Sequence, residues 1–477
     1  MDNKNKSKKL NTGDVIVVAF GAMIGWGWVV SSGGWIQQSG VIGTILAFLL
    51  GGIMIYFVGL VYAELTTALP ENGGAKVFSQ HAFGTIGSFI CTWSIILSYI
   101  GVVCFEACSF PTIIQYIFPG FLKGYLYTVA GFDIYVTWLL VAIISCVLIT
   151  YINIKGVKTA AILQKLLTIV IAAVGMVLII ASLINGDSSN LEGQLFVGTG
   201  INKILGNVLS VAMVAPFFLF GFDVIPQAAE EINIPLKKLG KLIVFSIALA
   251  VAFYGMVVFA VGYGMVVFAV GYGMNKIELV MSLHGSGLVT ADAMAKLFHS
   301  EVMAKILILG GMCGIATSWN SFLIGGSRAL ESMASSYMIP HVFCKKHKKY
   351  QTPYLSLILI GILSIISLFF GRQMLTWISN CASFACCLTY CIVSLSFLRL
   401  RKKEANLPRP YKVKNYRFVG IMATMLSGFL CMMYLIPGTV CSMIDQELII
   451  TVLWTIVGIF FAIGCKVKYR DKFGKLG

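Results

Sequence analysis

Long continuous stretches of apolar residues dominate the chain, and they restrict its fold more than any other feature. Twelve such runs follow one another, at about 14–36, 41–69, 85–118, 134–152, 161–185, 204–227, 242–274, 303–325, 354–370, 374–398, 416–437 and 448–465. Most hold the roughly 20 residues that a helix needs to cross the hydrocarbon layer of a membrane. Helices are required because a bilayer offers no water to backbone polar groups. We therefore expect an all-α integral membrane protein with twelve transmembrane helices.

Composition excludes most other classes of protein. Hydrophobic residues make up 58% of the 477 residues, and charged residues only 11%. A soluble domain has about 25% charged residues, so a soluble fold of this size would lack the polar surface to cover itself. The runs are also longer and more uniformly apolar than the alternating strands of a transmembrane barrel. A soluble enzyme, a disordered chain, a fibrous protein and a transmembrane β-barrel are all excluded.

Lysine and arginine are unevenly distributed when the runs are threaded back and forth across a membrane. With the N-terminus in the cytoplasm, 29 of the 35 basic residues fall in inside segments. The remaining residues are Lys123, Lys203, Lys276, Lys296, Lys305 and Arg372. Cytoplasmic loops carry such an excess, so we expect a multi-pass cell-membrane protein with both termini in the cytoplasm. The net charge of +16 is then explained by basic residues in cytoplasmic loops, and it does not indicate binding of nucleic acid. The expected partners are the lipid bilayer and a small substrate, and not nucleic acid.

The seventh run contains an exact internal repeat. Residues Tyr254–Gly262 read YGMVVFAVG, and residues Tyr263–Gly271 repeat them letter for letter. Nine helical residues add about 13.5 Å and a net half turn, so a continuous helix would present its opposite face beyond the repeat. We interpret the repeat as a tandem duplication in this copy of the chain, and we expect it to disturb packing.

The first run contains three glycines close together, Gly21, Gly25 and Gly27. Each glycine weakens a helix by up to about 1 kcal/mol relative to alanine. A break here would aim free N–H groups, at the positive end of a helix dipole, toward an anion. The alternative is close helix packing through small residues.

The sixth run has a matching interruption between Pro216 and Pro226, with Gly221 and the carboxylate of Asp223 between the two prolines. The first and sixth runs occupy equivalent positions if the chain consists of two five-helix halves of opposite topology. Paired interrupted helices in corresponding positions indicate the central site of a secondary transporter. The two interruptions together therefore favour a functional interpretation over simple packing.

Four motifs in order resemble the amino acid–polyamine–organocation permeases. They are the glycine-rich first run, Ala63-Glu64-Leu65 through Pro70-Glu71-Asn72-Gly73-Gly74, Phe220-Gly221-Phe222-Asp223 with Ala229-Glu230-Glu231, and Ser327-Arg328-Ala329-Leu330 running to Pro340. The resemblance covers about residues 10–420. It implies a LeuT-like fold, in which two inverted five-helix repeats (14–185 and 204–398) and two further helices (416–465) lie between cytoplasmic tails (1–13 and 466–477). It also implies a carrier of amino acids or related amines that works by alternating access.

The resemblance implies the residues of the central site as well. The expected substrate-binding residues are Met23, Gly25, Trp26, Gly27, Phe217, Phe220, Gly221 and Phe222. Backbone amides of Gly25, Trp26 and Gly27 would hold the substrate carboxylate. Carbonyl groups of Met23, Phe217 and Phe220 would meet the ammonium group. The rings of Phe220 and Phe222 are candidates for an aromatic gate, although an aromatic residue in a membrane helix more often serves packing.

Two positions depart from the family pattern. Trp26 stands where the family often has a small residue, so its ring either narrows the pocket or faces away. Some proton-coupled members carry a lysine midway along the fifth helix, a position that falls near Ile171 here. The basic residues Lys155, Lys158 and Lys165 all lie earlier. Proton coupling through that lysine is therefore not expected.

Other residues are candidates for coupling or gating. Glu106 and Asp223 are carboxylates inside apolar runs, where a charge is costly and an acid is a functional candidate by default. The structural alternative for Asp223 is a hydrogen-bonded acid at a helix end. Thr317 and Ser318 offer hydroxyl oxygens to a sodium ion, although such residues more often bond to their own helix.

The remaining alternatives concern the class of function. The chain has no Gly-x4-Gly-Lys-Ser/Thr loop, no His-Glu-x-x-His and no Cys/His cluster, so neither ATP-driven pumping nor metal-dependent catalysis is expected. We expect a non-enzymatic carrier without a bound cofactor or metal, coupled to H⁺ or Na⁺ as a symporter or an exchanger. The alternatives are a carrier of polyamines or other organic amines, a membrane enzyme, a non-transporting sensor on the same fold, and a channel.

Overall fold

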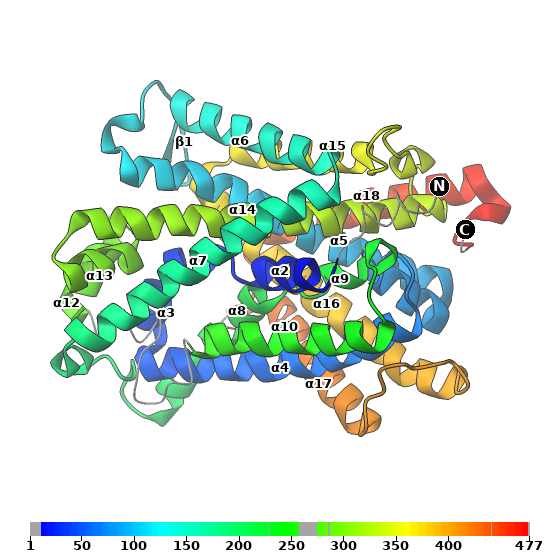
Figure 1. The fold of residues 1–477 in the computed structure, drawn as a ribbon, viewed down its shortest axis with the longest axis horizontal. Helices are drawn as coiled ribbons and strands as arrows, with labels where there is room; N and C mark the ends of the chain where they lie inside the picture. The colour runs from blue at the N-terminus through cyan, green and yellow to red at the C-terminus, as the bar shows by residue number, and fades with distance from the viewer. Residues whose placement is uncertain (1–10, 228, 257–273, 285–286, 440, 476–477) are drawn as a thin grey trace.

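The computed structural model describes residues 11–227, 229–256, 274–284, 287–439 and 441–475 as a bundle of long helices with one short β-hairpin (Figure 1). The helices are α2 (Thr12–Met23), α3 (Gly27–Ser39), α4 (Val41–Ala68), α5 (Ala75–Ile117), α6 (Val136–Ile154), α7 (Val157–Asn185), α8 (Ile201–Leu219), α9 (Val224–Gln227), α10 (Leu236–Met256), α12 (Lys276–His284), α13 (Val289–Phe298), α14 (Glu301–Ser335), α15 (Tyr354–Leu368), α16 (Met374–Lys403), α17 (Tyr416–Leu435) and α18 (Asp445–Tyr469). The 3₁₀ turns are η1 (Pro119–Phe121), η2 (Ser188–Leu191), η3 (Ala229–Glu231), η4 (His341–Cys344), η5 (Gly371–Gln373) and η6 (Arg470–Lys472).

The apolar runs form the long helices, as the sequence predicts. Within the described ranges, ten helices are long and apolar enough to cross a membrane, if α2–α3 and α8–α9 each count as one. The predicted run 242–274 overlaps α10, which begins earlier, at Leu236, and the run 354–370 contains the 15-residue helix α15. The prediction of a mostly helical chain, with helices long and apolar enough to cross a membrane, is therefore confirmed. Most of the nine-residue repeat, at 257–271, lies outside the described residues.

The hairpin was not expected, because the sequence prediction places an apolar run from residue 134. Strands β1 (Tyr125–Val129) and β2 (Phe132–Tyr135) pair antiparallel, with Val129 opposite Phe132. Ala130 and Gly131 connect the strands, and both have positive φ, at 48° and 85°. Two such residues form the primed turn that matches the twist of a hairpin. The strictly all-α description is wrong here, because aromatic and β-branched residues flank this turn.

Helix α5 also differs from its predicted run, because it begins at Ala75 instead of at residue 85. Gly84 lies inside it with φ 73° and ψ −164°, so a short helix and a long one meet there at a kink. The predicted boundary at 85 is the start of the long part. The short helices α12 and α13 were not predicted, because neither is long enough to form an apolar run.

The broken helices lie among the long helices of the bundle (Figure 1). Helix α5 packs along α14 and α16, α4 packs along α8 and α10, and α2 packs against α7, α10 and α14. Helix α18 is only 11% buried over its most apolar window, with side chains such as Leu453 and Phe460 exposed. A helix of this kind suits contact with lipid.

The two ends of the bundle differ in what they carry. The β1–β2 hairpin, α12 and α13 lie at one end, on the left in Figure 1, and the C-terminal turn η6 lies at the other. We call these the hairpin end and the C-terminal end.

Candidate functional site

The first apolar run is interrupted near its middle, as its glycines predict. Helix α2 ends at Met23 and α3 begins at Gly27, with Ile24 at φ −103° and ψ 74° between them. The first N–H groups and the last C=O groups of any helix lack partners within that helix. In the described part of the chain, the N–H groups of Gly25 and Trp26 donate to no protein acceptor. The break therefore presents bare peptide groups inside the bundle.

The sixth run is interrupted in the corresponding place. Helix α8 ends at Leu219 and α9 begins at Val224. Asp223 ties this break together, because its Oδ1 accepts the N–H of Gly221 at 3.0 Å and its Oδ2 accepts the hydroxyl of Tyr99 at 2.8 Å. The carboxylate is fully buried and does not line the central cavity. These contacts favour the structural alternative for Asp223, an acid that holds a helix end.

The two breaks touch each other at Gly221. This residue has φ +135°, and a Cβ atom placed on it would lie 2.8 Å from Ala22 Cβ and 3.1 Å from Met23 N. Such distances are shorter than van der Waals contact, so no side chain fits here without moving the backbone of α2. The last turn of α2 is therefore held directly against the second break.

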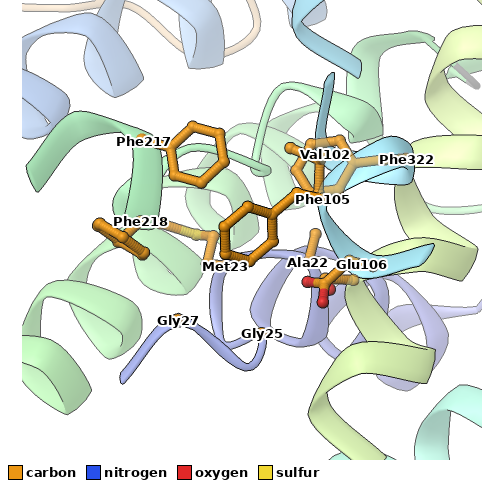
Figure 2. Close-up of a pocket in the computed structure, with 11 residues that line it drawn as sticks. Ala22, Met23, Gly25, Gly27, Val102, Phe105, Glu106, Phe217, Phe218 and Phe322 are labelled. Atoms are coloured by element: carbon orange, nitrogen blue, oxygen red, sulfur yellow. The ribbon is translucent and has the colours of Figure 1, made fainter. Parts of the chain in front are cut away.

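A small cavity lies beside this contact (Figure 2). Its lining comes from α2, α3, α5, α8 and α14 and comprises Ala22, Met23, Gly25, Gly27, Val102, Phe105, Glu106, Phe217, Phe218, Ser318 and Phe322. We call it the central cavity. Its volume is about 20 Å³, which is room for about one water molecule. The aromatic rings must therefore move before an organic molecule fits, and the structure shows the site in a closed form.

Glu106 supplies the one carboxylate of the central cavity lining. The side chain is 3% exposed, and its Oε1 accepts the hydroxyl of Ser318. Its Oε2 has no hydrogen-bond partner in the described part of the chain. A buried acceptor without a partner is rare and calls for a functional explanation. In Figure 2 the carboxylate lies near Gly25, where an added Cβ would come within 2.9 Å of Oε1.

Three phenylalanine rings close the central cavity on one side. Phe105, Phe217 and Phe218 line it, and they also line a larger cavity toward the hairpin end. The ring centroids of Phe105 and Phe217 are 5.6 Å apart, and those of Phe217 and Phe218 are 5.2 Å apart. Phe218 also covers Gly27, where a Cβ atom would lie 2.3 Å from the ring. We call these three rings the aromatic wall.

Two residues that the sequence placed in the site point elsewhere. The ring of Trp26 lies against Gly311 of α14, where an added Cβ would be 1.8 Å from it, so Trp26 faces away from the central cavity. Phe222 packs between Tyr62 and Tyr390, with centroid distances of 5.5 and 5.8 Å. Neither residue lines the central cavity. The backbone N–H of Trp26 nevertheless remains part of the first break.

Phe220 and Thr317 lie next to the site without lining it. The Phe220 ring packs on Phe322 at 4.9 Å. The Thr317 hydroxyl donates to the carbonyl of Gly314 on its own helix at 2.8 Å, as such residues commonly do. Of the site residues predicted from the sequence, the structure brings six together at the central cavity: Met23, Gly25, Gly27, Glu106, Phe217 and Ser318. The sequence prediction missed Ala22, Val102, Phe105, Phe218 and Phe322, which are apolar residues with no chemical signal of their own.

Gln164 of α7 contacts both α2, which leads into the first break, and α14. Its Nε2 donates to Ser321 Oγ at 2.6 Å and lies 3.3 Å from the carbonyl oxygen of Val18 on α2. Ile171 instead packs against Gly314, and Lys165 is exposed. A neutral amide therefore bridges α2, α7 and α14 in this structure.

Comparison with known proteins places this geometry in a family. The sequence model of the family described as amino acid permease matches residues 10–461. The branched-chain amino acid permease BcaP of Bacillus subtilis (strain 168) is 25% identical over 441 residues, which cover 90% of this chain and 88% of the relative. The aspartate-proton symporter of the same organism is 25% identical over 430 residues, covering 89% and 79%.

A third relative has a different kind of substrate in its name. The methylthioribose transporter of Bacillus subtilis (strain 168) is 24% identical over 449 residues, covering 91% of this chain and 90% of the relative. The match to the family model spans nearly the whole chain, including both broken helices. The chain is therefore a member of the amino acid permease family.

Proposed function

We propose that this protein is a secondary active transporter that moves amino acids or closely related amines across the membrane by alternating access. The observation that carries the proposal is the contact of two interrupted helices at Gly221, beside a cavity that Glu106 lines. A zwitterion needs N–H groups at one end and C=O groups at the other. The start of α3 offers the first, and the ends of α2 and α8 offer the second.

The relatives support the substrate class without specifying the substrate. Their names include branched-chain amino acids, aspartate with a proton, and methylthioribose, at 24–25% identity. Because relatives at this identity differ in their substrates, we infer the substrate class from the residues of the site. The peptide groups of Gly25, Trp26 and Gly27, with the carbonyl groups of Met23 and Phe217, suit an amino acid backbone. Phe220, Gly221 and Phe222 form the second break beside the cavity, and the Phe222 ring packs away from the ligand against Tyr62 and Tyr390.

We infer twelve membrane spans, in which α10 and α15 complete the set. The repeats then comprise residues 14–185 and 204–398, with residues 416–465 as two further helices. The matching positions of the α2–α3 and α8–α9 breaks support inverted repeats. The excess of basic residues in alternate loops supports a cytoplasmic position for both termini. The hairpin end would then face outward.

Glu106 is our candidate for coupling to protons. Its unpartnered Oε2 is positioned to exchange a proton when the central cavity opens to water. Ser318 would hold the carboxylate in place through the hydroxyl contact. A sodium ion bound by Thr317 and Ser318 is the alternative, and it requires both hydroxyl groups to leave their present partners. Asp223 would contribute to transport only as a structural residue, through its hydrogen bonds to Gly221 and Tyr99 at the second break.

Reconstituted protein tests the proposal. Proteoliposomes loaded with each of the twenty amino acids, or with putrescine and spermidine, would be assayed for counterflow of the labelled compound. Saturable exchange of an amino acid supports a carrier, and exchange of a polyamine alone supports the amine alternative. Linear flux would indicate a channel, and binding without flux would indicate a sensor.

Variants of the first break locate the site. Gly25→Leu and Gly27→Leu should abolish counterflow while the protein stays in the membrane, because each side chain would enter the central cavity lining. Gly34→Leu is the matched control on α3, because an added Cβ at that position meets nothing within 4 Å. Unchanged kinetics in both leucine variants would contradict the site assignment.

A further inference from the structure

A second, larger cavity lies between the aromatic wall and the hairpin end. Its volume is about 340 Å³, within the range of small-molecule sites, whereas the central cavity holds about one water molecule. The aromatic wall is shared by both cavities. We call the larger space the vestibule. The vestibule therefore borders the central cavity across the aromatic wall.

The described lining residues of the vestibule carry one formal charge, and that charge is positive. Its lining residues are Val30, Ser31, Trp35, Phe105, Phe132, Val214, Phe217, Phe218, Arg372, Gln373, Leu375, Thr376, Ser379, Asn380 and Ser383. In this described part of the lining, Arg372 is the only ionised side chain. The guanidinium group is half-buried and, within the described ranges, has no carboxylate within 4.0 Å and no hydrogen-bond acceptor.

Two acidic residues beside the linings of these cavities have hydrogen-bond partners of their own. Asp133, which lines a neighbouring cavity together with Arg372, accepts the hydroxyl of Thr128 at 2.6 Å. Glu447 accepts the amide of Asn380 at 2.7 Å. An arginine that is half-buried without a carboxylate has room for an anionic partner from outside the protein. Its planar guanidinium matches a carboxylate with two parallel hydrogen bonds.

The rest of the lining suits the other parts of an amino acid. Hydroxyl groups of Thr376, Ser379 and Ser383 lie on one face of α16, and their oxygen atoms can accept from an ammonium group. Other parts of the lining are apolar, with Trp35 packed edge-on against Phe218 at 4.8 Å. A side chain of the substrate would rest against these rings.

We propose that the vestibule is a second amino acid site, in which Arg372 binds the α-carboxylate of the substrate before the aromatic wall opens. This inference rests on the proposed function, because it takes an amino acid as the ligand. Arg372 is a binding residue of this outer site and does not contact the central cavity. The positive charge also raises the local concentration of carboxylate-bearing molecules at the mouth of the pathway.

Kinetics of uptake into whole cells test the assignment. Each of the twenty amino acids, radiolabelled, is first offered to cells that express the wild-type chain, and the best substrate is carried forward. Arg372→Gln should raise the KM for that amino acid about tenfold, the usual effect of losing a hydrogen bond to a charged group. The maximal rate should change little, because the central cavity is intact. Arg372→Lys should fall between the wild type and Arg372→Gln.

Lys123→Gln provides a matched control, because it removes one exposed positive charge at the hairpin end without touching the vestibule. A higher KM in Arg372→Gln but not in Lys123→Gln supports the outer site. Equal KM values in the two variants would overturn the outer site while leaving the transporter assignment in place. An equal loss of maximal rate in Arg372→Gln and Arg372→Lys, at normal protein level and unchanged KM, would also overturn it. A wild-type chain that takes up none of the twenty amino acids would overturn the proposed function together with this site.

Discussion

Replacement of Gly221 by alanine tests the contact between the two helix breaks more directly than any other change. The residue has φ +135°, a conformation that costs about 1–3 kcal/mol for a residue with a side chain. The new Cβ would lie 2.8 Å from Ala22 Cβ and 3.0 Å from the carbonyl carbon of Ala22. Because the second atom belongs to the backbone, a change of rotamer does not relieve the clash.

The strain alone corresponds to a factor of about 5–150 in the equilibrium between conformations that keep and lose this contact. We therefore expect Gly221→Ala to reduce the initial rate of uptake by at least about fivefold and to lower the midpoint of thermal unfolding in detergent. Gly206→Ala is the matched control on α8, because its Cβ meets nothing within 4 Å. Both variants would be compared at equal amounts of protein in the membrane fraction.

The outcome that refutes this reasoning is specific. If Gly221→Ala and Gly206→Ala show the same uptake rate and the same unfolding midpoint, the breaks do not depend on their contact. The geometry of the central cavity would then need another explanation.

Three further predictions follow from other parts of the chain. Glu106→Gln should abolish accumulation driven by an imposed pH gradient but leave counterflow, and accumulation at the wild-type level would contradict a role in coupling. Glu64→Gln should lower the free energy of unfolding by about 3–5 kcal/mol, because breaking a buried ion pair leaves charges uncompensated. The buried Glu64 carboxylate lies 2.6 Å from a guanidinium nitrogen of Arg401 and 3.2 Å from one of Arg409. An unchanged midpoint of thermal unfolding would contradict this prediction. Deletion of residues 263–271 should raise uptake or stability, whereas a fall in both would show that the repeat is integral.

The position of both breaks was predictable from the sequence, because their causes are local. Gly25 and Gly27 weaken one helix, and Gly221 with Pro216 weakens the other. The structure places the interruptions at 24–26 and 220–223. The hairpin at Tyr125–Tyr135 was missed, although its aromatic and β-branched residues favour strands, because hydropathy alone does not separate a short strand from the start of an apolar helix.

The lining of the site was predicted only in part. Adjacent residues of a helix point about 100° apart, so the sequence does not say which of two neighbours faces a cavity. Glu106 faces the central cavity, whereas Trp26 faces Gly311 and Phe222 faces Tyr62. These orientations depend on how each helix is rotated against its neighbours.

The sequence by itself determined that this chain lies in a membrane as helices and that two of the helices are broken. Both results follow from the transfer of apolar residues out of water and from backbone preferences, which act over a few residues. Only the tertiary structure decided how the distant segments meet. The breaks touch at Gly221 and, among the residues that the structure describes, Glu106 Oε2 has no hydrogen-bond partner and Arg372 is the one charged residue of the vestibule lining. Those properties require segments more than a hundred residues apart to pack together, and packing between distant segments is not encoded in any single stretch of sequence.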